Sequence, residues 1–183
     1  MPKLKYRFRV LFENFGVSKP TTELSKQIVN AGRPNLTFDQ VELHVYNSRV
    51  KYAGKHTWED VSVVVRDDVT GAVSKLVGEQ LQKQFDFLEM ASAASGIDYK
   101  FLTKIEILDG GNGAATPVVR ETWELYGCFL SEVNYGDMNY GTSEPATIAM
   151  TIKFDNAVQV NTAGDQVGVG QPITRTVNDV TTG

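Results

Sequence analysis

Hydrophobic and polar residues alternate along much of the first 154 positions, and this alternation predicts β-strands. Successive side chains of a strand point to opposite faces, so a strand with one buried face shows a two-residue period. The period is clearest in residues 146–154, where every second side chain from Ala146 to Phe154 is hydrophobic. The segments predicted as strands are 5–15, 36–46, 49–52, 58–66, 101–108, 118–133 and 146–154.

A different period begins after residue 70. Hydrophobic residues recur three or four positions apart from Val73 to Leu88, and acidic and basic residues occupy many of the positions between them. This spacing predicts one amphipathic helix over about residues 70–92. Asp67 and Asp68 stand before it and are predicted to cap it, because acidic groups stabilise a helix N-terminus. A weaker helical pattern covers residues 22–29, inside a connection over 16–34.

About six or seven strands and one long helix predict a mainly β (α+β) fold. A single helix covers one face or end of an antiparallel sheet system, which favours a β-sandwich or half-barrel with the helix packed on it. The composition changes at residue 160, after which Thr, Gly, Val and Asp predominate and aromatic residues are missing. The sequence therefore predicts a β domain over 1–159 and a C-terminal arm or flexible tail over 160–183.

Charge is distributed unevenly along the chain. The formal net charge is −4: residues 1–100 carry fourteen Lys and Arg against twelve Asp and Glu, whereas 101–183 carry four against ten. A net acidic chain without clustered basic residues is a poor candidate for gripping nucleic acid by its phosphates. Unlike patches on one subunit suit head-to-tail contact between identical copies, and an ordinary solvated surface of mixed charge accounts for any single patch at least as well.

Neither membrane insertion nor secretion is predicted. The sequence contains no hydrophobic run of about 18 residues, the length that a membrane-spanning helix needs. Lys3, Lys5, Arg7 and Arg9 alternate with hydrophobic residues, whereas the charges of a signal peptide precede a hydrophobic block. The protein is therefore expected to stay in the cytoplasm of the cell that makes it.

No constellation for catalysis, a metal or a cofactor is predicted. Cys128 is the only cysteine and lies in a hydrophobic stretch, which favours a buried, unreactive thiol. His44 and His56 lack the spaced partners of a metal site, so surface or lining positions are expected for both. The glycine-rich run 110–113 precedes neither the lysine nor the helix of a phosphate-binding loop, so a flexible hairpin loop is expected there.

The segment from Val50 to Phe85 carries a more specific signal. A strand ends at Ala53-Gly54, a strand with the spacing Thr57-x-x-Asp60 follows, and the Asp67-Asp68 pair then precedes the amphipathic helix. Further on come a strand that rises from a glycine-rich loop, a strand with Trp123 and Gly127, a loop at Tyr135 and the strand 147–154. In this order the chain resembles, over roughly residues 3–159, the tail tube protein family of contractile-tailed bacteriophages.

The resemblance implies a β-sandwich or barrel-like subunit with a flanking helix and a structural, non-enzymatic role. Six copies would form a ring whose sheets join into one barrel, and rings would stack head to tail inside a contractile sheath. The implied partners are other copies of the chain, the sheath protein, the tape measure protein, and baseplate and tail-terminator proteins. Genomic DNA would pass through the channel without specific binding. The implied location is the virion tail, assembled in the host cytoplasm.

Two sets of residues are expected to serve such an assembly. Contacts between subunits or rings are predicted for Asn47, Arg49, Lys51, Val160, Thr162 and Gln166. Positions facing the lumen or solvent are predicted for Glu42, His44, Thr147, Thr151 and Lys153.

Two other functions fit the same sequence. The first is a tube protein of a related contractile injection or secretion system, or the baseplate protein that initiates the tube. The second belongs to a different class: a small-molecule-binding β-sandwich or a hydrolase, which would be a monomer with a concave pocket holding perturbed carboxylates or a histidine.

Overall fold

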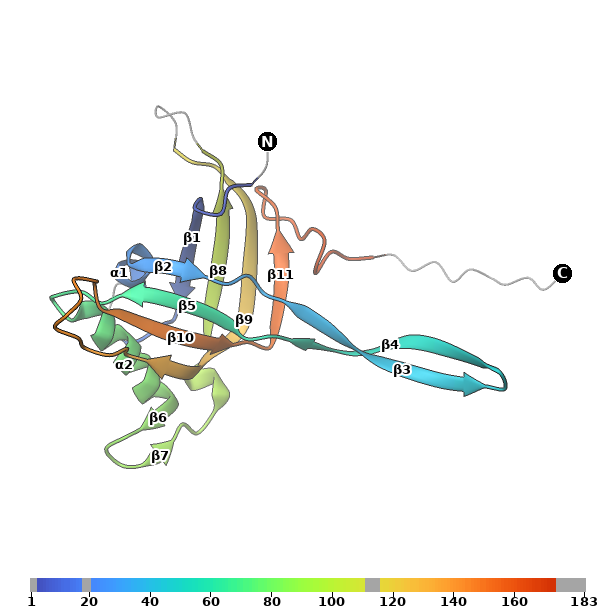
Figure 1. Cartoon of the computed structure of the whole chain (residues 1–183), viewed down its shortest axis with the longest axis horizontal. Helices are drawn as coiled ribbons and strands as arrows, with labels where there is room; N and C mark the ends of the chain where they lie inside the picture. The colour runs from blue at the N-terminus through green and yellow to red at the C-terminus, as the bar shows by residue number, and fades with distance from the viewer. Residues whose placement is uncertain (1–2, 18–20, 111–115, 174–183) are drawn as a thin grey trace.

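The computed structural model describes residues 3–17, 21–110 and 116–173, and the element order is mainly β (Figure 1). The helices are α1 (Thr21–Lys26) and α2 (Ala72–Gln84), with a 3-10 turn at Gly96–Asp98. The strands are β1 (Phe8–Glu13), β2 (Ile28–Ala31), β3 (Leu36–Val45), β4 (Ser48–Trp58), β5 (Val61–Arg66), β6 (Phe85–Asp86), β7 (Ala91–Ser92), β8 (Phe101–Leu108), β9 (Val119–Asn134), β10 (Thr147–Lys153) and β11 (Asn156–Val160).

Seven strands form one antiparallel system in two layers. The order is β1-β8-β9-β10-β5-β2, and β11 pairs with β9 beside this path. Strand β9 belongs to both layers, because its first part pairs with β8 and β11 whereas its last part, from Phe129, pairs with β10. In Figure 1 the strands β2, β5 and β10 run across β1, β8 and β11. The predicted antiparallel sandwich is confirmed.

Gly127 lies where β9 passes from one layer to the other. Its backbone φ is 68°, in the left-handed region that glycine adopts without strain. A Cβ at this position would collide with the carboxylate of Asp155, which forms an ion pair with Lys100 at 2.5 Å. The bend therefore requires a glycine for its dihedral angles and for space.

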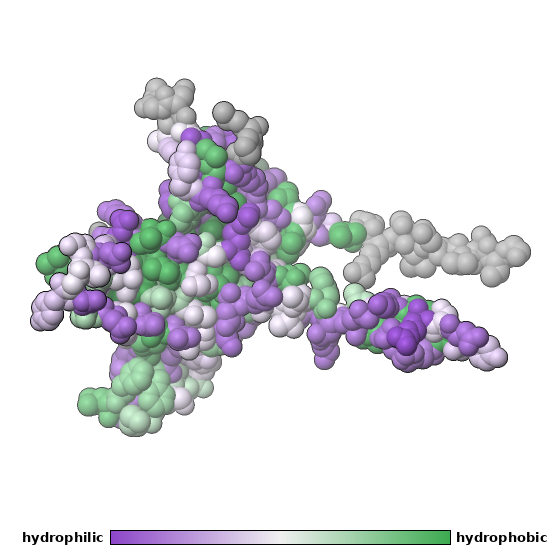
Figure 2. Space-filling model, viewed as in Figure 1, coloured by the Kyte–Doolittle hydropathy of each residue, from purple (hydrophilic) through white to green (hydrophobic). Residues whose placement is uncertain are grey.

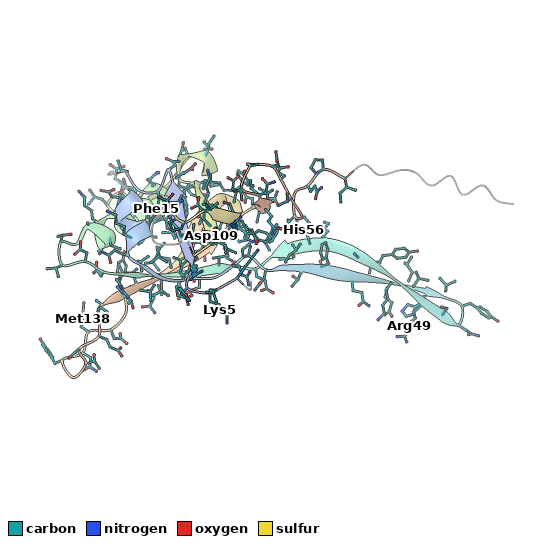
Figure 3. All side chains as sticks on the ribbon, turned by 90° about the horizontal axis from the view of Figure 1, so that it is seen from above. Lys5, Phe15, Arg49, His56, Asp109 and Met138 are labelled. Carbon is teal, nitrogen blue, oxygen red and sulfur yellow. The ribbon has the colours of Figure 1, made fainter. Side chains whose placement is uncertain are left out.

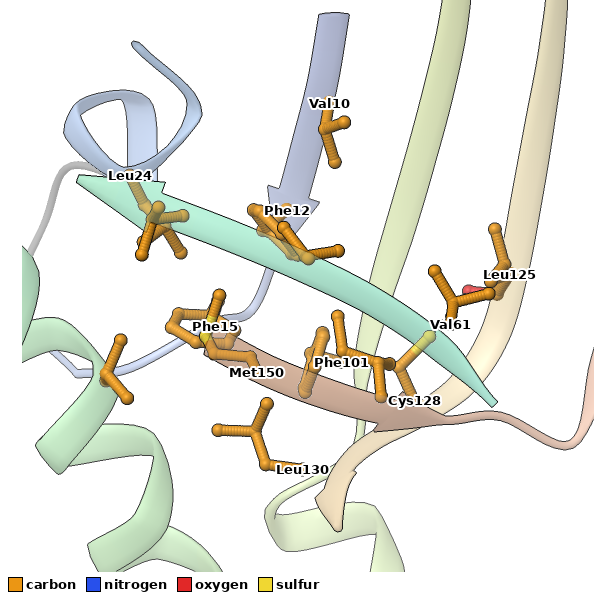
Figure 4. Close-up of a cluster of buried hydrophobic side chains, with 14 of the residues drawn as sticks. Val10, Phe12, Phe15, Leu24, Val61, Phe101, Leu125, Cys128, Leu130 and Met150 are labelled. Atoms are coloured by element: carbon orange, nitrogen blue, oxygen red, sulfur yellow. Dashed lines mark hydrogen bonds between the residues drawn. The ribbon is translucent and has the colours of Figure 1, made fainter. Parts of the chain in front are cut away.

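The core lies between the two layers and under α2 (Figure 4). The alternating residues of β5 and β10 point into it, as their hydrophobic period predicts. Gln80 of α2 is fully buried, accepts a hydrogen bond from Gly16 N at 3.0 Å and donates one to Tyr99 O at 2.7 Å. It thereby ties the segment after β1 and the segment before β8 to the helix. The core includes Val61, Val63, Val65, Val73, Leu76, Val77, Ile148, Met150 and Ile152.

The predicted helix is present but ends at Gln84, eight residues before the expected end. Phe85 has an extended backbone, with φ −151° and ψ 126°. Next, the Asp86 carboxylate accepts hydrogen bonds from the backbone N–H groups of Leu88 and Glu89, at 2.9 and 3.2 Å. This local turn competes with helix continuation. Leu88 is therefore exposed instead of completing the apolar helix face.

Asp67 and Asp68 do not cap α2, so that prediction is wrong. Gly71 occupies the N-cap position, and no side chain accepts a hydrogen bond there. Asp68 instead accepts from the Thr70 hydroxyl at 2.7 Å and closes the turn before the helix.

The hydrophobic pattern did not predict β2 and β11, and one predicted turn is absent. Strand β2 lies in the connection expected over 16–34, and β11 lies between the last predicted strand and the arm. Strand β4 runs through Ala53-Gly54-Lys55 without a turn. Gly54 lies at the register shift between β3 and β4, where a Cβ would be 3.0 Å from Asp39 O. Close backbone approach, not a turn, explains this glycine.

The described part of the arm, residues 160–173, folds back on the domain. Gln159 N donates to Val169 O at 2.8 Å, and Val167 N donates to Gln159 O at 2.9 Å. Residues 165–169 thus run along the outer edge of β11. The domain boundary at 159/160 stays a prediction, and residues 174–183 and 111–115, including most of the predicted glycine-rich loop, lie outside the described residues.

Candidate assembly surfaces

The β3–β4 hairpin projects from the body of the molecule (Figures 1 and 3). It forms a sheet of its own, joined to the rest at Leu36 and Trp58. At about 3.3 Å per residue, the 11 residues of β4 reach about 35 Å. A two-residue turn closes the hairpin, with Tyr46 at φ 47° and fully exposed. An isolated two-stranded hairpin is only marginally stable in water.

One face of the hairpin is hydrophobic and uncovered. The register places Val41 opposite Tyr52 and Leu43 opposite Val50, and paired residues share a face. All four side chains, together with Val45, are between 39% and 55% exposed. The alternating sequence predicted this apolar face, but it did not show that the face lies outside the core.

The opposite face is polar and carries four of the predicted residues. Glu42 lies opposite Lys51, and His44 lies opposite Arg49. The Arg49 guanidinium is 3.8 Å from the Glu42 carboxylate. The predicted contact residues Arg49 and Lys51 therefore share one surface with the predicted lumen or solvent positions Glu42 and His44. Asn47 lies in the turn at the tip.

His56 is exposed near the base of the hairpin, and its ring meets the Trp58 indole edge-on at 6.4 Å. Both histidines thus occupy surface positions. The remaining lumen or solvent positions lie on β10: Thr147 opposite Arg66, Thr151 opposite Ser62, and Lys153 with its ammonium 3.8 Å from the Asp60 carboxylate. They alternate with the core residues of β10, so they do form its outward face. Their part in a lumen stays a prediction.

The arm residues predicted to contact other copies make contacts within the subunit. The Thr162 hydroxyl donates to Val119 O at 2.8 Å, and Val160 bridges to Gln166. Nearby, the buried Glu121 carboxylate accepts hydrogen bonds from Gln159, Trp123 and Lys3. These contacts hold Lys3 and the start of the arm against β9.

Two strand edges are covered by the chain itself. The arm lies along β11, and the Gln84 side-chain amide both donates to Leu130 O and accepts from Leu130 N, at 2.9 Å each. The Gln84 side chain thereby makes the two backbone hydrogen bonds that a neighbouring strand would make at this edge of β9. Covered edges resist uncontrolled pairing with other chains.

The hollows between β1 and β2 are lined by basic and apolar side chains. They involve residues 3–10, α1 and β2, with Arg33, Ile105 and Ile107. Their described lining includes no carboxylate and no histidine. Across the residues that the structure describes, no group of three or more His, Cys, Asp or Glu side chains is placed to hold a metal ion.

A second apolar projection is the β6–β7 turn, pale to deep green at the lower edge of Figure 2. Phe87, Leu88 and Met90 are all more than half exposed there. The sequence pattern placed these residues in the helix and therefore missed the turn. The signal that could have found it is Asp86, whose short carboxylate favours turns over helix interiors.

Several solved structures contain a chain with a similar fold. The chain is similar to a chain of the anti-feeding prophage baseplate, with a TM-score of 0.66 and 11% identity, covering 88% of this chain and 97% of that one. It is similar to a chain of the anti-feeding prophage tube-terminating cap, at 0.63 and 13%, covering 88% and 92%. It is also similar to a chain of the PVC extracellular contractile injection system sheath–tube complex, at 0.61 and 14%, covering 87% and 92%.

No family model matches the sequence, and no curated protein does. The chain therefore shares its fold with these baseplate, tube-terminating cap and sheath–tube chains, which is consistent with the fold that the sequence resemblance implied. Within the described ranges, no helix is long and apolar enough to span a membrane.

Proposed function

We propose that this chain is a structural subunit that assembles with copies of itself into the tube of a contractile, tail-like particle. The observation that carries the proposal is the projecting hairpin with an uncovered apolar face, on a fold shared with tube, cap and baseplate chains. An apolar face exposed to water costs free energy until a partner covers it, so a hairpin that is solvated on both faces would be expected to carry polar residues on both.

At finer detail, we propose hexameric rings stacked into a phage tail tube, with genomic DNA passing through the channel. The partners would be the sheath, tape measure, baseplate and tail-terminator proteins, in a virion tail assembled in the host cytoplasm. The net charge of −4 supports a conduit, because a net acidic protein repels DNA weakly instead of retaining it.

A second candidate shares the fold: a tube protein of an injection or secretion system, or the baseplate protein that initiates the tube. The similarity to chains of an extracellular contractile injection system favours it. Polymer formation would distinguish the tube protein from the tube-initiating baseplate protein. We expect a tube protein to form stacked rings by itself and an initiator to form single rings.

Sedimentation velocity of the purified full chain at rising concentration tests the proposal. A self-assembling subunit gives rings first and then larger polymers as the concentration rises. A small-molecule-binding sandwich or a hydrolase stays a monomer. A single monomeric species across the whole concentration and salt range would contradict the proposed function.

A further inference from the structure

The molecule has two unlike ends. In Figure 3, Arg49 lies toward the far end of the β3–β4 hairpin and Met138 lies at the opposite end of the long axis. Along the hairpin, β4 carries Arg49, Lys51 and Lys55 and β3 carries Asp39 and Glu42. Of these, Arg49, Lys51 and Glu42 lie toward the tip.

The opposite end is formed by two neighbouring loops. Residues 66–71 comprise Arg66, the last residue of β5, and the connection to α2, and residues 135–146 connect β9 to β10. Asp67 N donates to Ala146 O at 2.9 Å, which holds the loops side by side. Burial, and after it the negative charge of Asp67, raise the pKa of Tyr135.

These two loops are acidic and expose apolar side chains. They carry the acids Asp67, Asp68, Asp137 and Glu144 against one cation, Arg66, and Lys26 of α1 lies outside them. Hydrogen bonds from the Thr70 hydroxyl and backbone lower the pKa of Asp68, so it is ionised at neutral pH. The apolar side chains at this end are Val69, Tyr135, Met138 and Tyr140, all exposed.

We infer that the hairpin tip of one copy docks on the paired loops 66–71 and 135–146 of the next copy. Basic residues then face acidic ones, and the apolar hairpin face meets exposed Met and Tyr side chains. The contact is heterologous, so an open series of any length keeps one free hairpin at one end and one free loop pair at the other, and further copies can add there. This inference rests on the proposed function and names the acceptor surface for the hairpin.

Charge reversal at each end separates this contact from any other. The hairpin variant is Arg49→Glu with Lys51→Glu, and the loop variant is Asp137→Lys with Glu144→Lys. Each variant alone should raise the critical concentration for polymerisation by about tenfold or more, because like charges then meet. A Glu89→Lys control, in the β6–β7 turn, changes charge at neither end and should polymerise like the parent chain.

Mixing the two variants is the decisive measurement. An acidic hairpin then meets basic loops, and the unchanged hairpin of the loop variant meets the unchanged loops of the hairpin variant. Polymer measured by sedimentation should therefore return in the equimolar mixture and in the chain with all four substitutions. If melting shows that a reversal variant is unfolded, Arg49→Gln with Lys51→Gln and Asp137→Asn with Glu144→Gln replace the reversals, and each should weaken polymerisation.

The outcomes distinguish this inference from the proposed function. Parent chain that polymerises while folded variants of both ends polymerise equally well would overturn the docking contact and leave the tube role standing. The docking contact is also overturned if both variants are defective and their equimolar mixture stays defective. Parent chain that never assembles would overturn the proposed function itself.

Discussion

Cys128 occupies the residue after the β9 bend and is fully buried. Its thiol lies 3.2 Å from Leu125 O, and burial raises the pKa of Cys128 to about 11. The thiolate is the reactive form, so at pH 8 the native thiol is both protonated and shielded. We expect no reaction with a disulfide reagent such as Ellman's reagent in the folded protein, and one equivalent after denaturation. Rapid labelling of the native chain at pH 8 would contradict a structural, inert Cys128.

Glycine is required at Gly127 for two independent reasons, its positive φ and the nearby Asp155 carboxylate. Gly127→Ala should therefore lower the free energy of unfolding by about 1–3 kcal/mol. Gly78→Ala is the matched control, because nothing lies within 4 Å of its Cβ position in α2. It should raise stability by about 0.5–1 kcal/mol. Urea unfolding measures both, and equal effects would contradict the role of the bend.

At the scale of elements, the hydrophobic pattern predicted the long strands well, because each buries one face against the core. Residues 101–108 match β8, and 118–133 differ from β9 by one residue at each end. Strands β2 and β11 are short, and tertiary pairing rather than an alternating pattern sets their place. The end of α2 depended on one carboxylate, Asp86, whose turn outweighed the continuing apolar period.

The assembly surfaces were less predictable than the strands, for a physical reason. An apolar face on β3 and β4 looks the same in sequence whether the core of the same chain or another molecule covers it. Only the register and the projection of the hairpin show that Leu43 and Tyr52 remain outside the core. Asn47, Arg49 and Lys51 could be chosen from turn chemistry, whereas their proximity to Glu42 and His44 needed the fold.

The arm is the element whose removal is most informative. Deleting residues 161–183 removes the segment that pairs with β11 and the bond from Thr162 to Val119 O. We expect a lower melting temperature and impaired polymerisation, because an uncovered β11 edge invites misdirected pairing. Deleting only 174–183 keeps every described contact of the arm and should leave the melting temperature unchanged. Normal tubes from the 161–183 deletion, seen by negative-stain microscopy, would refute a role for the arm in assembly.

At the scale of the whole molecule, the two ends that differ in charge are also ends that expose apolar side chains. The cations of the hairpin tip and the acids of loops 66–71 and 135–146 lie at opposite ends of the long axis. Exposed charge pairs are screened by salt, with a Debye length of about 10 Å at 0.1 M. Polymerisation driven partly by these pairs should therefore weaken between about 0.05 and 0.5 M salt, as light scattering would show. Scattering that does not change with salt would contradict an electrostatic share in the contact.

Self-assembly into a tube is the central claim, and electron microscopy of the purified full chain tests it most directly. The account predicts rings with a central channel that stack into tubes as the concentration rises, with the β3–β4 hairpin of each subunit seated on a neighbouring copy. Images that show only separate monomers at every concentration and salt would contradict it.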